Sequence, residues 1–206
     1  MRLILCAFSA LLISASVFAQ QTTADGLYFN TFGDAQNPSI VFLHGGPGYN
    51  SFSFEFGAAQ TLADAGFYVV VFDQRGCGRS VAGQPADFTI VNAAKDVATV
   101  LQASHASRPL LIGHSWGGTL ALEFLKLYPG VARGAVLADA PVNWPAAMHS
   151  MIANMTLAFQ QSGQTQYAQY AQQLLGEMFP NGLNVPYSFT MEEVGDTLEV
   201  AVGAKL

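Results

Sequence analysis

Short apolar runs alternate with amphipathic stretches through the first two thirds of the chain. Apolar runs at residues 39–43, 67–72, 109–112 and 135–138 predict strands buried on both faces, and 27–31 predicts a short edge strand. Helical spacing of apolar positions follows at 52–65, 89–101 and 119–127. This alternation of strand and helix predicts an α/β fold built on a parallel sheet with right-handed crossovers.

Two of the predicted helices have a defined apolar face. The first begins after Thr89, a residue suited to capping, and the second ends at Pro129-Gly130. The apolar positions are Ile90, Ala94, Val97 and Leu101 in the first helix, and Leu120, Phe124 and Leu127 in the second.

From Asn143 onward the pattern predicts helices alone, with no further strand. Pro145 is tolerated at the start of the first helix, and Thr190 with Glu193 resembles a capping box that opens a third. One apolar stripe contains Met148, Met151, Ile152, Met155 and Phe159, and the next contains Tyr167, Tyr170, Ala171, Leu174, Leu175 and Met178. We expect a helical cap at 143–206, inserted after the core at 20–142 and lying over the carboxyl ends of the strands.

The amino-terminal segment has the features of a secretory signal peptide. Met1-Arg2 precedes an apolar, serine-containing run, and cleavage is expected after Ala19. The alternative, an uncleaved anchor, requires a longer apolar run. Residues 1–19 therefore predict export to the periplasm or the extracellular space, and removal of Cys6 leaves Cys77 without an internal disulfide partner.

Composition and charge restrict the kinds of partner that the chain is expected to bind. Just over half of the 206 residues are apolar, 51%, which suffices for a packed core. The formal net charge of −6 and the absence of a basic run argue against nucleic acid or an anionic membrane surface as partner. A small neutral or cationic ligand fits this charge better.

Ser115 is the first candidate for chemistry. It lies in Gly113-His114-Ser115-Trp116-Gly117, between a predicted strand and a predicted helix. A serine on such a turn is lifted clear of the sheet above the positive end of a helix, and flanking glycines allow strand and helix to approach closely. The segment therefore predicts a nucleophile elbow.

Two backbone amides are candidates for an oxyanion hole. The Trp116 N–H follows the nucleophile, and the Gly46 N–H lies in the loop His44-Gly45-Gly46-Pro47-Gly48. Such donors each stabilise the developing negative charge by about 3 to 4 kcal/mol. The alternative is that this loop is only a tight turn. The charged segment from Asp73 to Ser80 is interpreted as structural bracing, because Asp73 precedes the nucleophile whereas the acid of this arrangement follows it.

These three segments, in this order, resemble the proline iminopeptidase family of α/β-hydrolases over about residues 25 to 140. The resemblance implies a mostly parallel sheet with flanking helices and an inserted cap. It implies a Ser-Asp-His hydrolase that releases the amino-terminal residue, often proline, from small peptides, without metal or organic cofactor.

The sequence to Leu206 lacks a convincing acid and base. His44, His105 and His114 are interpreted as structural or exposed. His149 is the only histidine after Ser115, and Asp139 could partner it, giving an internal alternative triad. In the resembling family both groups come from loops after two further strands, so we expect them beyond Leu206, with the last strands of the fold missing from this chain.

The cap offers only weak candidates for substrate binding. Glu177, Glu192, Glu193, Asp196 and Glu199 could hold a free amino terminus or be solvated charges. Trp144, Phe159, Tyr167 and Tyr170 could wall a pocket, although packing onto the sheet is the simpler expectation.

Two other functions stay open. The fold also hosts esterases, lactonases and epoxide-type hydrolases, all of which would act on a small ester or related substrate. The chain could also be a non-catalytic product that lacks the triad Asp and His.

Overall fold

The described strands form one seven-stranded sheet. The computed structural model describes residues 21–80, 83, 87–180 and 201–202, so the predicted signal peptide lies outside it. The strand order is β1-β2-β4-β3-β5-β6-β7, with β1–β2 and β2–β4 antiparallel and every later pair parallel. The strands are β1 (Gln21–Thr22), β2 (Tyr28–Phe32), β3 (Ser39–Leu43), β4 (Tyr68–Phe72), β5 (Leu110–His114), β6 (Gly134–Ala138) and β7 (Ala201–Val202). The predicted α/β architecture is confirmed.

Two strand predictions need correction. The strand expected at the edge, β2, lies inside the sheet, because Gln21 and Thr22 pair with Phe29 and Tyr28 on its outer side. The expectation of helices alone after Asn143 is also wrong, since β7 pairs in parallel with β6. A two-residue strand leaves almost no periodic signal in a sequence, and its position depends on backbone hydrogen bonds to a neighbouring strand.

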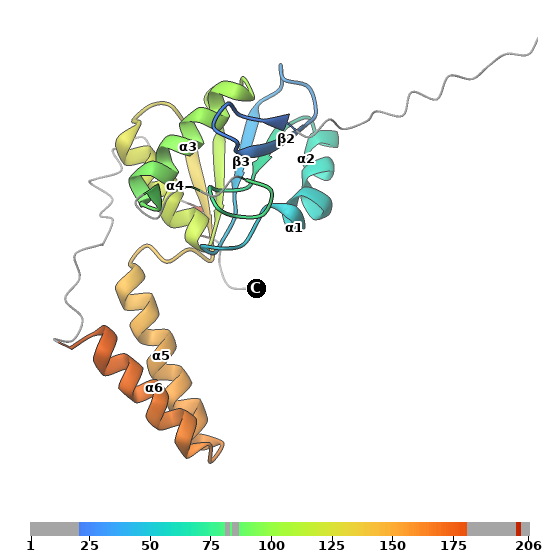
Figure 1. Cartoon of the computed structure of the whole chain (residues 1–206). Helices are drawn as coiled ribbons and strands as arrows, with labels where there is room; N and C mark the ends of the chain where they lie inside the picture. Colours follow the sequence, from blue (N-terminus) through green and yellow to red (C-terminus); the bar gives the residue numbers. More distant parts are fainter. Residues whose placement is uncertain (1–20, 81–82, 84–86, 181–200, 203–206) are drawn as a thin grey trace, which may run out of the picture.

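Helices cover both faces of the sheet (Figure 1). One face carries α3 (Ile90–Ala103) and α4 (Trp116–Leu127), and the other carries α1 (Phe52–Phe54), η1 (Glu55–Ala59) and α2 (Gln60–Asp64). The capping prediction for α3 is confirmed, because the Thr89 side chain accepts from the Asn92 N–H. The single helix expected over 52–65 instead contains a π-helical segment at η1.

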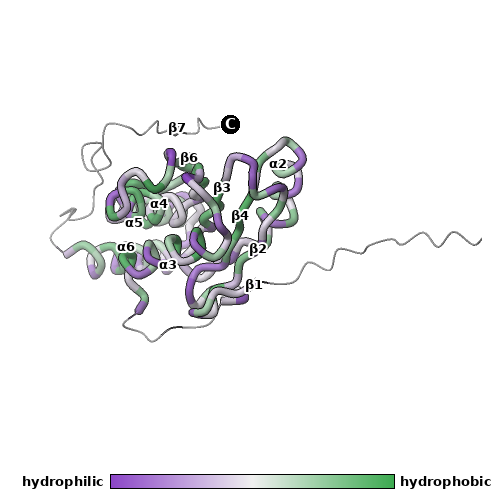
Figure 2. The backbone as a smooth tube through the Cα atoms, turned by 90° about the horizontal axis from the view of Figure 1, so that it is seen from above, coloured by the Kyte–Doolittle hydropathy of each residue, from purple (hydrophilic) through white to green (hydrophobic). Residues whose placement is uncertain are grey.

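Alternate strand residues form the core on the two faces. Val41, Val70 and Leu111 pack under α3 and α4, whereas Ile40 and Val71 pack under α1, η1 and α2. Figure 2 shows the hydrophobic character of β3 and β4 at the centre of the sheet. One predicted core position is wrong: Leu127 is 40% exposed, although Phe124 and Leu125 in the same turn are buried, because Leu127 lies at the margin of the buried face of α4.

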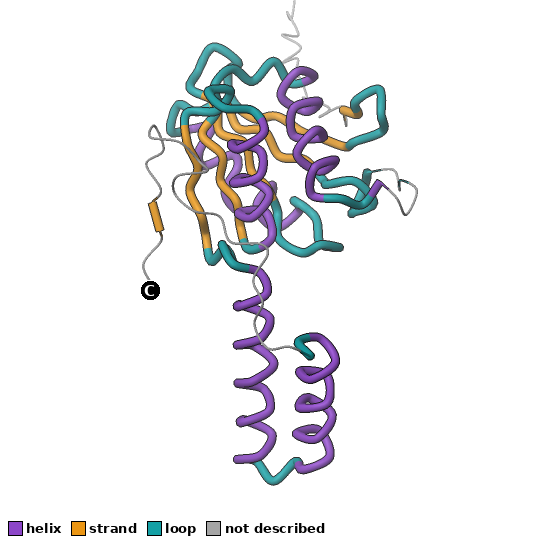
Figure 3. The backbone as a smooth tube through the Cα atoms, turned by 90° about the vertical axis from the view of Figure 1, so that its left-hand side faces the viewer, coloured by secondary structure: helices purple, strands orange, loops and turns teal. Residues whose placement is uncertain are grey.

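The two remaining helices form a hairpin that projects from the sheet (Figure 3). They are α5 (Trp144–Gln161) and α6 (Thr165–Met178), and they pack chiefly against each other. Only the first turns of α5 border the cavity at Ser115. Of the two predicted stripes, Ile152 and Ala171 are buried. Several of their other members are exposed, namely Met151, Met155, Tyr167, Tyr170 and Met178.

The parallel register brings three loops to one edge of the sheet. Leu43 pairs with Gly113, and His114 pairs with Ala138. The loop after β3, the turn after β5 and the residue after β6 therefore converge where ligands bind in open α/β sheets.

The beginning of α4 touches the sheet so closely that only glycine fits. A Cβ on Gly117 would lie 2.0 Å from the carbonyl oxygen of Leu43, and one on Gly118 would lie 2.2 Å from the Ala140 Cβ. Helix and strand therefore meet backbone to backbone just after Ser115.

We predict opposite effects for two helical glycine substitutions. Gly117→Ala should lower the free energy of unfolding by more than about 2 kcal/mol, because the new methyl collides with backbone. Gly176→Ala, in α6 with open space around it, should raise it by about 0.5 to 1 kcal/mol through helix propensity. Urea denaturation followed by circular dichroism measures both, and equal shifts would contradict the close-contact interpretation.

Candidate active site

Ser115 occupies a strained turn between β5 and α4. Its φ of 51° and ψ of −122° lie outside the regions that non-glycine residues usually adopt. Backbone hydrogen bonds hold it there: the Ser115 N–H donates to the Ala138 carbonyl, and the Gly118 N–H donates to the Ser115 carbonyl, both at 2.9 Å. Such strain costs about 1 to 3 kcal/mol and persists only where the surroundings enforce it. The geometry is that of the predicted elbow.

Two cavities meet at Ser115. The larger, of about 680 Å³, lies between the end of β6 and the start of α5. Its lining residues are Gly46, Ser115, Leu137, Asp139, Ala140, Pro141, Val142, Trp144, Ala147, Met148 and Met151. The smaller, of about 430 Å³, lies on the side of the loop after β3 and also includes Ser115 and Gly46. The Ser115 turn is therefore accessible from two sides.

The loop after β3 brings Gly46 to both cavities. Gly46 has a φ of +132°, and a Cβ there would lie 2.8 Å from the Gly48 nitrogen, so this conformation requires glycine. Trp116 is the first residue of α4, where a backbone N–H has no acceptor within the helix. Both predicted oxyanion donors are thus next to the serine.

His44 has a structural role. It is 1% exposed, its Nδ1 lies 2.7 Å from the Gly45 carbonyl, and its Nε2 accepts from the Gln74 N–H at 2.9 Å. Burial lowers the pKa of His44, because the charged form would lose its hydration. The imidazole is therefore neutral and already hydrogen-bonded at both nitrogens.

Gln74 links the loop to the nucleophile turn, a connection that the sequence analysis missed. Its amide donates to the His44 carbonyl at 2.7 Å, and its Oε1 accepts from the Trp116 indole N–H at 3.1 Å. The only sequence signal was its place inside the Asp73–Ser80 segment, next to a charged residue. Its side chain therefore bridges the first residue of the glycine loop and the residue after the serine.

The bracing proposed for Asp73 is present. Asp73 is fully buried and accepts hydrogen bonds from the Ser51 N–H and hydroxyl and from the Arg79 backbone and guanidinium. Burial by itself would raise the pKa of Asp73, but these donors outweigh it and hold the pKa at about 2. Asp73 ties the turn after β4 to the start of α1 and is not directed at Ser115.

Arg79 extends this bracing to β2. Its Nη2 lies 2.8 Å from Glu55 Oε2, and its guanidinium stacks 3.5 Å from the centre of the Tyr28 ring. Tyr28 in turn donates to Glu55 Oε1 at 2.8 Å. A second pair, Arg75 with Asp96 at 2.6 Å, ties the same turn to α3. The charged residues of this turn therefore connect it to β2, η1 and α3, and none of these ion pairs includes Ser115.

The internal alternative triad is not assembled. Asp139 follows β6 with a φ of 50° and lines the larger cavity beside Ser115. His149 packs edge-on against Phe179, with ring centres 5.4 Å apart, and is absent from that lining. His105 is exposed in the turn after α3, and His114 is exposed beside the smaller cavity. The structure brings Asp139 to the serine and leaves His149 elsewhere.

Of the candidate substrate-binding residues in the predicted cap, some lie at the Ser115 cavity and others lie away from it. Trp144 lines the larger cavity, whereas Phe159 packs on Tyr167, and both Tyr167 and Tyr170 are largely exposed. The expectation that these aromatic residues pack onto the sheet is therefore wrong, because the hairpin projects away from it. Glu177 is exposed and bonded to Gln173, and Glu192, Glu193, Asp196 and Glu199 lie outside the described residues, as does the Thr190 capping box.

The described residues offer neither a metal-binding cluster nor a membrane-spanning helix. These residues contain no group of three or more His, Cys, Asp or Glu side chains arranged to hold a metal ion. In the same part of the chain, no helix has both the length and the apolar character needed to cross a membrane.

We predict that Asp73→Asn lowers the free energy of unfolding at pH 7 by about 3 to 5 kcal/mol, because Arg79 loses its buried partner. In the unchanged protein, the low pKa of Asp73 stabilises the fold at pH values above 3.8, the usual pKa of this group. About 2 kcal/mol of this stability is lost as the pH falls toward 2. Urea titrations at several pH values measure both effects.

Asp64→Asn is the matched control. Asp64 is exposed and accepts only from Gln60 of its own helix turn, so this change should stay within about 0.5 kcal/mol at pH 7. An Asp73 variant with an equally small effect would contradict the bracing role.

Comparison with known proteins supports this geometry. The chain is 35% identical over 112 residues to a putative proline iminopeptidase of Mycoplasma pneumoniae, a match that covers 54% of this chain and 35% of the relative. It is 36% identical over 110 residues to epoxide hydrolase B of Mycobacterium tuberculosis, covering 52% of this chain and 30% of that one. The chain thus matches about a third of the length of these curated relatives.

A solved structure agrees with the sequence matches. The crystal structure of a proline iminopeptidase-related protein from Thermus thermophilus superposes with a TM-score of 0.59 at 33% identity, over 67% of this chain and 49% of that one. The family model described as alpha/beta hydrolase fold matches residues 38–199, which include β3, the Ser115 turn and the hairpin. The chain belongs to the α/β-hydrolase fold family.

Proposed function

We propose that this protein is a serine hydrolase that forms an acyl-enzyme on Ser115. The observation that carries the proposal is the strained Ser115 turn, open to two cavities with Gly46 beside it. A covalent nucleophile must be exposed and held in one orientation, and both conditions are met at this turn. Family membership supports the same class of reaction.

In the proposed reaction, the Ser115 hydroxyl oxygen attacks a carbonyl carbon and loses its proton to a base. The carbonyl π electrons move to the oxygen, where the Gly46 and Trp116 N–H groups stabilise the negative charge. Collapse of the tetrahedral intermediate expels the amine or alcohol, which takes the proton, and water then releases the acyl group. The identity of the base and the acid stays a prediction.

For the substrate, we propose small peptides from which the amino-terminal residue, often proline, is released. The proline iminopeptidase name of one relative and the size of the larger cavity support this choice. An esterase, lactonase or epoxide-type activity is the second candidate, supported by the relative named epoxide hydrolase. We also propose export directed by residues 1–19, on the sequence features already given.

We predict that a fluorophosphonate probe labels Ser115 in protein that contains the predicted acid and base, because the base activates the hydroxyl. Ser115→Ala should abolish labelling, since no other described serine lies on a strained strand-to-helix turn. Ser53→Ala is the matched control, because Ser53 lines the smaller cavity from α1 and should leave labelling unchanged. Intact-mass spectrometry measures the adduct. Labelling that persists in Ser115→Ala, or a folded protein that is not labelled, would contradict the proposal.

In protein that contains the predicted acid and base, we predict that prolyl p-nitroanilide gives the highest kcat/KM in a panel with p-nitrophenyl butyrate and styrene oxide. His149→Ala should keep the wild-type rate, because this ring packs on Phe179 away from Ser115. Preference for the ester or the epoxide would favour the second candidate. Absence of turnover with all three, from folded protein, would favour a non-catalytic product, and a rate lost with His149 would restore the internal triad.

A further inference from the structure

A separate cavity lies behind the nucleophile turn, between α3, α4 and the start of α5. It has a volume of about 210 Å³, and its described lining residues are Ile90, Trp116, Thr119, Glu123, Val142, Trp144 and Pro145. Ser115 is absent from this lining, although Val142 and Trp144 also border the larger Ser115 cavity. The two hollows therefore share a wall without sharing the nucleophile.

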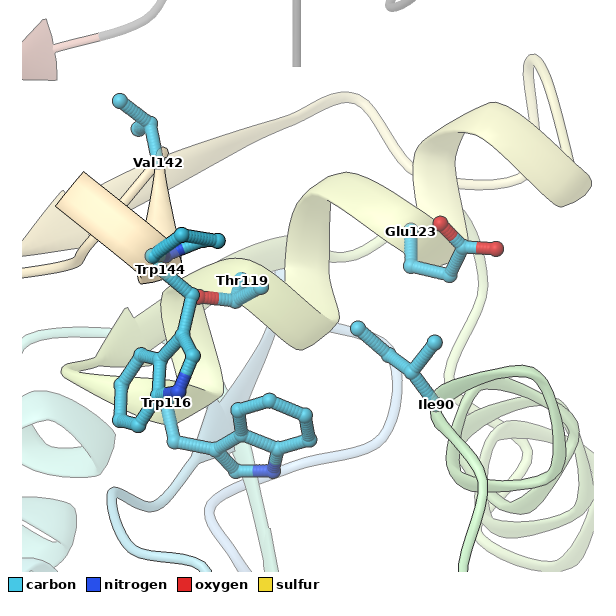
Figure 4. A pocket seen from close by; sticks show the side chains of 7 residues that line it. Ile90, Trp116, Thr119, Glu123, Val142 and Trp144 are labelled. Atoms are coloured by element: carbon cyan, nitrogen blue, oxygen red, sulfur yellow. The ribbon is translucent and has the colours of Figure 1, made fainter. Parts of the chain in front are cut away.

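Two indole rings form one side of this cavity (Figure 4). Trp116 and Trp144 meet edge to face, with ring centres 5.9 Å apart and an angle of 78° between their planes. Indole rings are the aromatic side chains whose faces attract cations most strongly. The indole N–H of Trp116 donates to Gln74, so that ring has a fixed orientation.

The opposite side of the cavity carries an acidic residue, whose carbon stem lies toward Ile90 (Figure 4). Figure 4 shows Glu123 on α4, above Ile90 and across from the tryptophans. Glu123 is the one charged side chain among the described lining residues. The Thr119 hydroxyl donates to the Pro141 carbonyl, which leaves it without a proton to offer an anion.

This combination selects for one charge type. Tryptophan faces attract cations through the ring quadrupole, and a carboxylate adds a direct electrostatic attraction. The remaining lining side chains, Ile90, Val142 and Pro145, would contact an apolar body. The formal charge of −6 for the whole chain acts in the same direction.

We propose that this cavity binds a small organic cation, an ammonium group on a compact apolar body, independently of Ser115. Drug-sized ligands usually occupy about 300 to 1,000 Å³, so a cavity of 210 Å³ suits a molecule of the size of benzylammonium. The assignment goes beyond the hydrolase function proposed above and does not depend on it.

Intrinsic fluorescence gives a direct test, because Trp116 and Trp144 are the two tryptophans of the chain. Titration with benzylammonium should change the emission saturably, whereas neutral benzyl alcohol should bind about tenfold more weakly. Equal affinities for the two probes, or an emission that does not change with benzylammonium, would overturn the proposal.

Three variants isolate the contributions. Glu123→Gln should bring the affinities for benzylammonium and benzyl alcohol to within about twofold of each other. Glu177→Gln, a matched change at an exposed position of α6, should keep the preference for the cation. Met151→Ala, at a position that lines the larger Ser115 cavity and not this one, should also bind benzylammonium normally, which separates this cavity from the proposed hydrolase site. Circular dichroism checks that each variant is folded. A preference retained in Glu123→Gln would contradict the role of the carboxylate.

Discussion

The backbone contact between the start of α4 and the sheet is the constraint on which the site depends. Gly117 faces the Leu43 carbonyl at a distance that leaves no room for a side chain. This contact draws the helix against β3, so the chain must turn sharply between β5 and α4. Ser115 takes up that turn with its unusual backbone angles. The close approach of α4 to β3 therefore explains both the strained backbone of Ser115 and the need for glycine at position 117.

Charged residues stabilise this arrangement from the side of the turn after β4. Most of the protein has few charges, yet Asp73, Arg79 and Glu55 form a connected, largely buried group. Burying charges is costly unless each finds partners, and here Ser51, Tyr28 and Asn30 supply further hydrogen bonds. The network joins β2, α1 and the end of β4. Gln74, next to Asp73 in sequence, connects this network to the loop after β3 and to Trp116 through two side-chain hydrogen bonds.

The beginning of α5 connects the sheet edge with both cavities near the serine. Trp144 and Val142 border the larger Ser115 cavity on one side and the smaller tryptophan-lined cavity on the other. A movement of the hairpin at this point would change the shape of both hollows together. The projecting part of the hairpin, with its exposed Met155 and Tyr170, has no comparable contact with the described core.

The sequence alone was sufficient for the order of the central strands and the helices between them, the elbow serine, the glycine loop and the bracing role of Asp73. These features depend on local periodicity and on residues at fixed spacing, which a linear chain displays. Tertiary structure decided the rest. Whether His149 reaches Ser115 depends on the direction of the hairpin, and the exposure of Leu127 depends on which face α4 turns toward the sheet. The Gln74 bridge and the pairing of Trp116 with Trp144 join residues far apart in the chain, and no local pattern encodes such a distance.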